Sequence, residues 1–275
     1  MSHFACLTFD FDAISSWLFR GQNTPTAISR GEFGVTASGR ILDLLDRHGI
    51  KSTWFIPGHT IDTFPDACLR VVEAGHEVGH HGYLHEPPAQ LEREQEEAVL
   101  LRGIECIQRL TGGPPAGYRS PSWDLSPHTV ELLVTHGFLY DSSMMAHDYL
   151  PYPARNGDVM EKDHVVFGAH TRLLEMPVSW SLDDFPHFEY RRLDGMLQQG
   201  LMNAGQVQEN FVDDFRYMAQ SAAPGVLTYT FHPQVIGRGH RMLMLERLIE
   251  ELSDLGAEFV RMDEAAARFA RVVSA

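Results

Sequence analysis

Short strand-like runs alternate with helix-like stretches along almost the whole chain, and this alternation limits the possible folds more than any other feature. The strand-like runs are rich in β-branched and aromatic residues and are bounded by turn residues. They lie at Phe4–Phe11, Ser52–Ile56, Glu77–His81, Gly117–Ser120, Leu139–Asp141, Leu173–Val178, Val226–His232 and Glu258–Met262. Repeated strand-then-helix order with close to eight strands predicts a parallel (β/α) barrel, irregular or incompletely closed. No linker or repeat divides the 275 residues, so we expect a single α/β domain over residues 1–275.

Helix start and stop signals fill most of the segments between these strands. The helices are predicted at Ser38–His48, Ala89–Leu110, Ser126–Gly137, Gln206–Ala219 and His240–Leu255. The segment Ser15–Gly34 is instead rich in Gly, Ser, Thr and Arg, and we interpret it as a long loop above the mouth that follows the first strand. Loops of this length serve as lids or subunit contacts, or simply decorate the surface.

Composition excludes several classes of partner. The net charge is -15 and Lys and Arg form no cluster, so we expect neither a nucleic acid nor an anionic membrane as a partner. No run approaches the ~20 apolar residues of a membrane span, and the first residues lack the pattern of an export signal. Cys6, Cys68 and Cys106 are odd in number and widely spaced, which argues against a disulfide framework. A cytoplasmic protein is therefore expected.

Alternation within the first strand separates two kinds of side chain. Cys6, Thr8, Asp10 and Asp12 share one face, whereas Leu7, Phe9 and Phe11 share the other. Two carboxylates on one face repel each other, which favours a bound cation or a raised pKa. Barrel enzymes assemble their active sites at the carboxyl ends of strands, where this chain places polar, reactive groups. These groups are Asp10, Asp12, His81, Arg119, Asp141 and His232.

Two histidines four residues apart, His81 and His85, predict a metal site together with one of the aspartates. Two imidazoles and one carboxylate leave a fourth position open, as in catalytic rather than structural zinc sites. Gly82 and the Pro-Pro pair after the second histidine favour an ordered loop over a helix. His76 and His80 have the same spacing, but His76 lies on the entry side of its strand, so we favour the later pair.

Four motifs in order resemble those of the polysaccharide deacetylase family, the NodB homology group of carbohydrate esterases. They are Leu7-Thr8-Phe9-Asp10-Phe11-Asp12, His81 to His85, Tyr118-Arg119-Ser120-Pro121 and Thr230-Phe231-His232-Pro233. The resemblance implies that Asp10 is the catalytic base, Arg119 its partner and His232 the general acid. It also implies a divalent metal, zinc or alternatively cobalt, nickel or manganese, held by Asp12, His81 and His85. The implied fold is an irregular (β/α) barrel of the NodB type.

One departure from the family pattern bears on function. Phe11 separates the two aspartates and Ala13 follows them in place of glycine, so the roles of Asp10 and Asp12 could be exchanged. The variant is similar to an intracellular branch that contains peptidoglycan-deacetylase-like proteins and cyclic imide hydrolases, with metal-independent allantoinases more distant. We expect a metal-dependent hydrolase of a non-peptide carbon–nitrogen bond, acting on an N-acetyl sugar or a small amide.

Some alternatives stay open at this point. The substrate is a small molecule or an oligosaccharide, and a cyclic imide or an allantoin-like ureide is the main alternative. A non-catalytic carbohydrate-binding relative is less consistent with the intact motifs. Trp123 and Trp180 could wall the pocket or pack in the core, and a homo-oligomer that shares the long loop is compatible with the sequence. The acidic partner of His232 is one of four aspartates: Asp141, Asp148, Asp183 and Asp184.

Overall fold

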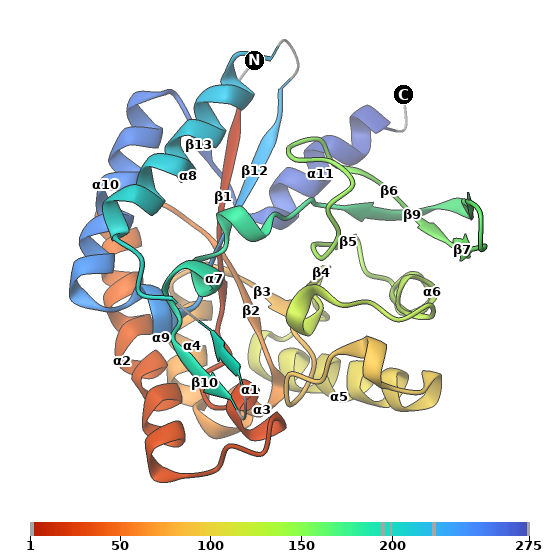
Figure 1. Cartoon of the computed structure of the whole chain (residues 1–275), viewed down its shortest axis with the longest axis horizontal. Coiled ribbons are helices and arrows are strands. Elements are labelled where there is room, and N and C mark those ends of the chain that lie inside the picture. The colour runs from red at the N-terminus through yellow and green to blue at the C-terminus, as the bar shows by residue number, and fades with distance from the viewer. Residues whose placement is uncertain (1–2, 194–195, 199, 222–223, 274–275) are drawn as a thin grey trace.

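Parallel strands dominate the central sheet of the computed structural model, which describes residues 3–193, 196–198, 200–221 and 224–273 (Figure 1). Within these residues the strand order is β12-β1-β2-β3-β4-β5-β9-β6, and β13 also pairs with β1. The strands are β1 (Phe4–Asp10), β2 (Thr53–Ile56), β3 (Glu77–His80), β4 (Gly117–Tyr118), β5 (Tyr140–Asp141), β6 (Tyr152–Asn156), β9 (Ala169–Glu175), β12 (Val226–Phe231) and β13 (Glu258–Phe259). The curled sheet does not close, because β12 and β6 lie at opposite ends of this order.

Every predicted strand is present, although most end one to three residues earlier than expected, so the irregular, incompletely closed (β/α) barrel is confirmed. The sequence did not reveal β6, which pairs antiparallel with β9 and contains Pro153. Proline suits such an edge strand because it removes a donor that an edge need not satisfy. Two short hairpins were also missed: β7 (Val159–Met160) with β8 (Val165–Val166), and β10 (Arg191–Leu193) with β11 (Met196–Gln198).

Helices cover the sheet and include all those predicted, with shifted ends. They are α1 (Ser15–Phe19), α2 (Pro25–Arg47), α3 (Gly58–Thr63), α4 (Pro65–Glu73), α5 (Arg93–Thr111), α6 (Thr129–Thr135), α7 (Asp184–Phe188), α8 (Ala204–Ala219), α9 (Pro233–Ile236), α10 (Gly239–Asp254) and α11 (Met262–Val273). In Figure 1, α2, α9, α10 and α8 lie together on one side of the sheet. None of the helices in the described ranges is long and apolar enough to cross a membrane.

The prediction of a long loop at Ser15–Gly34 was wrong, because most of this segment is helical. The side chain of Thr24 accepts a hydrogen bond from the backbone of Ala27, and Pro25 occupies the first turn, so α2 begins with good capping chemistry. Gly31 lies inside α2 for a packing reason: a Cβ there would be 2.6 Å from the carbonyl oxygen of Ala13. Glycine thus permits a close approach of α2 to the segment after β1, despite its poor helix propensity.

The two faces of β1 differ as predicted. Leu7, Phe9 and Phe11 are buried in the largest hydrophobic cluster, and the rings of Phe9 and Trp54 stack with centroids 4.7 Å apart. On the opposite face Thr8 donates a hydrogen bond to the carbonyl oxygen of Tyr229 at 2.9 Å. The parallel pairing of β1 with β12 and with β2 brings the carboxyl ends of these strands to one edge of the sheet. The polar residues that follow each strand therefore meet there.

Candidate metal centre and acid–base site

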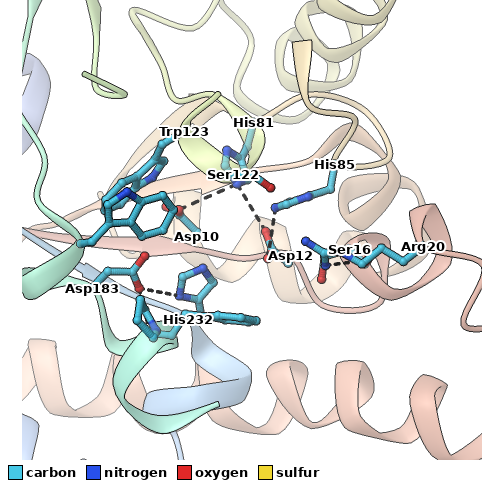
Figure 2. Close-up of a pocket in the computed structure, with 13 residues that line it drawn as sticks. Asp10, Asp12, Ser16, Arg20, His81, His85, Ser122, Trp123, Asp183 and His232 are labelled. Atoms are coloured by element: carbon cyan, nitrogen blue, oxygen red, sulfur yellow. Dashed lines mark hydrogen bonds and ion pairs between the residues drawn. The ribbon is translucent and has the colours of Figure 1, made fainter. Parts of the chain in front are cut away.

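Five of the six candidate residues line one cavity of about 210 Å³ at this edge of the sheet (Figure 2). They are Asp10 and Asp12 at the end of β1, His81 directly after β3, His85 in the following loop and His232 directly after β12. Arg119 follows β4 and is fully buried behind Asp10. The structure therefore brings together, from four strands, all six residues to which the family resemblance assigns catalysis or metal binding.

Asp12, His81 and His85 form a compact, buried group whose ligand atoms all lie within 4.8 Å of one another. His81 Nε2 lies 3.4 Å from Asp12 Oδ1, and His85 Nε2 lies 3.6 Å from Asp12 Oδ2. Asp12 Oδ1 and His85 Nδ1 are buried without a hydrogen-bond partner among the described residues. An unsatisfied buried carboxylate oxygen is costly, and a cation between Asp12 and the two Nε2 atoms near it would give Asp12 Oδ1 a partner.

The segment between His81 and His85 forms an ordered loop, as Gly82 and the two prolines predicted. Gly82 and His85 both have positive φ values, 70° and 63°, so the chain turns sharply at each. For histidine this left-handed conformation is a strained one that the surrounding structure must maintain. The carboxylate of Glu86 accepts hydrogen bonds from the backbone N–H groups of Tyr83 and Leu84, at 3.1 and 2.7 Å, which holds the loop.

Hydrogen bonding and charge give His85 and Asp12 the protonation states that metal binding needs. Burial lowers the pKa of His81, but Asp10 and Asp12 outweigh it and raise that pKa. His81 Nδ1 lies 2.7 Å from the carbonyl oxygen of Arg119, which can only accept, so Nδ1 carries the proton and Nε2 faces Asp12. Burial lowers the pKa of His85 to about 4, and this imidazole is neutral at pH 7. Burial would raise the pKa of Asp12, but His85 and His81 outweigh it and keep that pKa well below its usual value. Neutral imidazoles and an ionised carboxylate are what a divalent ion requires.

Asp10 is held by a different partner. Arg119 Nη1 donates hydrogen bonds to Asp10 Oδ1 and to Thr8 Oγ1, each at 2.8 Å, and its guanidinium lies 4.2 Å from the ring centroid of Phe55. Asp10 Oδ2 lies 3.8 Å from His81 Nε2, farther than either closest approach of Asp12 to a histidine. This geometry favours Asp12 over Asp10 as the metal ligand and leaves Asp10 oriented by a buried cation.

His232 pairs with two of the four aspartates that the sequence left open. Its Nδ1 lies 2.8 Å from Asp184 Oδ1 and 3.5 Å from Asp183 Oδ1, and its backbone N–H also donates to Asp184. Burial lowers the pKa of His232, but the carboxylates of Asp183 and Asp184 outweigh it and raise the pKa to about 10. Asp141 instead accepts a hydrogen bond from Ser143 at 2.7 Å, and Asp148 is an exposed partner of His147.

The earlier histidine pair is structural. His76 Nδ1 accepts a hydrogen bond from the backbone N–H of Ser52 at 3.0 Å, and His80 Nε2 lies 3.0 Å from the carbonyl oxygen of Leu100. Burial lowers the pKa of His76 to about 4 and that of His80 to about 3. Both imidazoles are hydrogen-bonded within the protein, and neither belongs to a candidate metal group formed by the described residues.

The cavity wall contains both tryptophans considered from the sequence. Trp123 and Trp180 lie with ring centroids 4.2 Å apart, and Ser122 and Trp123 have positive φ values of 60° and 52°, a strained conformation. Other wall residues were not predicted: Ser16, Arg20, Ser122, Phe185 and Pro186. One sequence feature indicated Ser16 and Arg20: they lie in the segment Ser15–Gly34, which was expected above the mouth that follows the first strand.

Comparisons with known proteins identify the family of the chain. The family described as polysaccharide deacetylase matches residues 6–140. The chain is 38% identical over 275 residues to a peptidoglycan deacetylase of Helicobacter pylori, and the match covers 94% of each protein. A crystal structure from Mycobacterium smegmatis, provisionally assigned as a polysaccharide deacetylase, has a TM-score of 0.84 and 30% identity. That match covers 98% of this chain and 91% of the other.

A more distant structure shares the fold alone. The Puue allantoinase matches with a TM-score of 0.77 and 23% identity, and the match covers 98% of this chain and 89% of that one. The family expected from the four motifs is thus confirmed by sequence and by structure. The chain belongs to the polysaccharide deacetylase family and is a hydrolase of the deacetylase type, acting on carbon–nitrogen bonds other than peptide bonds.

Proposed function

We propose that this protein is a metal-dependent hydrolase that cleaves the amide bond of an N-acetyl sugar or another small amide. The observation that carries the proposal is the buried group of Asp12, His81 and His85 at the wall of a cavity, in which each carboxylate oxygen of Asp12 lies near one imidazole and Oδ1 has no hydrogen-bond partner among the described residues. A divalent ion held there would polarise an amide carbonyl and activate water. Zinc is our first choice, and cobalt, nickel and manganese accept the same ligands.

The remaining residues have roles that follow from their partners. Asp10, kept in place by Arg119, is the proposed base that accepts a proton from the attacking water. His232 donates its Nδ1 proton to Asp184, so its Nε2 proton is the one available to the cavity. We assign His232 as the general acid that protonates the departing nitrogen, since its pKa of about 10 keeps it charged at neutral pH. Base and acid therefore act with opposite charges in one cavity.

The size of the cavity supports a small substrate. Its volume of about 210 Å³ lies below the roughly 300–1,000 Å³ typical of pockets for drug-sized ligands. The stacked rings of Trp123 and Trp180 narrow it on one side, and Phe185 lies at its wall. A single sugar residue or a short acyl amide fits these limits better than several sugar units in contact at once. Further expectations stay with the proposal: a cytoplasmic enzyme, without nucleic acid or membrane as partner, that forms a homo-oligomer.

A cyclic imide or a ureide is the second candidate substrate. Its support is the pair of tryptophan rings, because flat rings stack well on aromatic faces. A metal-free ureide hydrolase is less consistent with the site, since Asp12 Oδ1 would then stay buried without a partner among the described residues. A purely carbohydrate-binding role would not explain why the site contains the buried pairs Asp10–Arg119 and His232–Asp184, which suit a base and an acid.

One panel assay tests the proposal. The purified, metal-loaded protein is incubated with N-acetylglucosamine oligomers, simple N-acetyl amines, cyclic imides, hydantoins and allantoin, and the released amine or carboxylate is measured. Asp10→Asn serves as the control, because it removes the proposed base but preserves the size of the side chain. We expect one class to react at a rate that the variant lacks. Equal rates for the wild type and Asp10→Asn, or no hydrolysis of any compound, would refute the proposal.

A further inference from the structure

A second cavity, of about 150 Å³, is lined in part by Gln234, two residues after His232. It is formed where α2, α7, α9 and the start of α10 come together, on the left of the sheet in Figure 1. Three arginines line it, Arg30 from α2, Arg238 at the N-cap of α10, and Arg241 from the first turn of α10. Gln234, from α9, and Glu189 complete the polar part of the wall. None of these residues lines the hydrolytic cavity.

The positive charge of this cavity exceeds its negative charge. Three guanidinium groups face one carboxylate, that of Glu189, which is already paired with Arg30. Arg241 forms no ion pair within the part of the chain that the structure describes: its two terminal nitrogens donate to the carbonyl oxygens of Val235 and Phe188, at 2.9 and 3.2 Å. The wall thus carries a net charge of about two positive units without a counterion among the residues that line it.

Two of these arginines, Arg238 and Arg241, stack on aromatic rings instead of pairing with carboxylates of the described residues. The guanidinium of Arg238 lies 3.5 Å from the ring centroid of Phe33, and that of Arg241 lies 4.7 Å from the centroid of Phe188. Stacking of this kind fixes the plane of a guanidinium but leaves its N–H donors free for other partners. Stacking therefore holds the planes of both guanidinium groups in position, while the two terminal nitrogens of Arg241 also donate to backbone carbonyls.

Buried polar atoms in the same wall have no partner within the described residues. Gln234 is 7% exposed, and neither its amide oxygen nor its amide nitrogen makes a hydrogen bond. The Nε of Arg241, which is 6% exposed, is likewise unpartnered. Leaving buried donors unsatisfied is costly, so their presence beside a cavity indicates a ligand that accepts hydrogen bonds.

Repulsion between the arginines also indicates that the cavity binds an anion. Burial and the charge of Arg238 lower the pKa of Arg30, and burial and Arg40 lower the pKa of Arg238. Burial also lowers the pKa of Arg241, where Arg238 adds to the effect and Asp184 opposes it. Asp184 is already hydrogen-bonded to His232, so it is not free to enter the cavity. An added negative charge would relieve this repulsion.

We propose that this cavity binds a small molecule with an oxyanion group, a phosphate or a carboxylate, through Arg238, Arg241 and Gln234. Guanidinium groups bind both oxyanions in bidentate fashion, and the amide nitrogen of Gln234 adds a neutral donor. The volume admits a compact anion with a few further atoms, since a water needs roughly 10–15 Å³ on the same measure. The site is separate from the proposed metal centre and does not depend on the proposed function.

Calorimetric titration of the metal-loaded protein tests the site with two probes, inorganic phosphate and succinate. Arg238→Gln removes an exposed guanidinium with no bond to the backbone, and Gln234→Leu removes the buried amide at similar volume. Arg216→Gln is the matched control, because Arg216 is an exposed arginine of α8 paired with Asp213. We expect saturable binding of at least one anion, weakened about tenfold by each cavity variant and unchanged by the control. The tighter probe identifies phosphate or carboxylate as the natural group.

The stability of Gln234→Leu provides an independent readout. Because the amide has no partner in the folded protein, its loss should raise the midpoint of thermal unfolding while binding is lost. Absence of saturable binding by the wild type would overturn the proposal. Equal weakening in Arg216→Gln would also overturn it, since it would show general charge attraction. Binding that survives both cavity variants but disappears in His85→Ala would place the anion at the metal centre instead.

Discussion

Replacing Asp184 with asparagine should lower the pH at which activity is lost on the alkaline side. Asp184 Oδ1 lies 2.8 Å from His232 Nδ1, and both side chains are buried. Burial alone lowers the pKa of His232, but Asp183 and Asp184 outweigh it and raise the pKa from 6.5 to about 10. Asparagine has the same size and its oxygen can still accept the Nδ1 proton, so the substitution removes the charge and little else.

The size of the shift follows from the bond that loses its charge. A hydrogen bond to a charged group contributes about 1.5–3 kcal/mol, against about 1 kcal/mol for a neutral one. The difference of about 1 kcal/mol or slightly more corresponds to about one pKa unit. Asp183 remains, at 3.5 Å from His232 Nδ1, and keeps part of the elevation. We therefore expect the pKa of His232 to fall by about one unit.

The assay is the pH dependence of kcat/KM, whose alkaline limb reports the essential acid of the free enzyme. Asp213→Asn is the control, because Asp213 is an exposed residue of α8 and its replacement changes the net charge equally. We expect the alkaline limb to move to lower pH in Asp184→Asn and to stay in place in Asp213→Asn. An alkaline limb that does not move in Asp184→Asn would refute the assignment of His232 as the acid, as would the same movement in both variants.

Three further predictions concern other parts of the site. Arg119→Met should lower the free energy of unfolding in urea by about 3–5 kcal/mol, because Asp10 is left as a buried, unpaired charge; a loss below ~1 kcal/mol would show that Asp10 needs no cation. Trp180→Ala removes a ring from the cavity wall. A contact between a flat substrate and an aromatic face contributes about 0.5–1.5 kcal/mol, so KM should rise about two- to tenfold at nearly constant kcat, and an unchanged KM would contradict a wall role. Burial lowers the pKa of His80 from 6.5 to about 3. As the pH falls, this histidine therefore takes up a proton in the unfolded state at a higher pH than in the folded state. The contribution of neutral His80 to stability is present above pH 6.5 and is lost as the pH falls towards 3. His80→Gln should therefore flatten the dependence of the unfolding free energy on pH between these two values.

Much of the site was predictable because strand alternation and parallel pairing are local, regular rules. The pattern Leu7 to Asp12 assigns each side chain to a face, and the structure agrees for all the buried apolar members. Parallel pairing then places the residues after β1, β3 and β12 at one edge, whatever the length of the helices between them. The meeting of Asp12, His81 and His232 therefore needed only the strand assignments to be right.

What failed depended on contacts between segments far apart in the sequence. Glycines and hydroxyl residues in Ser15–Gly34 favour a loop locally, yet Gly31 lies in α2 because the helix packs against Ala13. The choice of Asp184 over the other aspartates depends on a 2.8 Å contact across 48 residues of sequence. Neither distance can be read from residue types, because each depends on how loops and helices pack on the finished sheet.

The metal content of four proteins tests the central claim most directly. Elemental analysis of the wild type, Asp10→Asn, Asp12→Asn and His85→Ala measures the bound divalent ion per chain, and hydrolysis is assayed in parallel. We predict one ion in the wild type and in Asp10→Asn, with turnover lost in the latter, and loss of the ion in Asp12→Asn and His85→Ala. Full activity in metal-free wild-type protein would contradict the account, as would an ion that stays in Asp12→Asn but leaves Asp10→Asn.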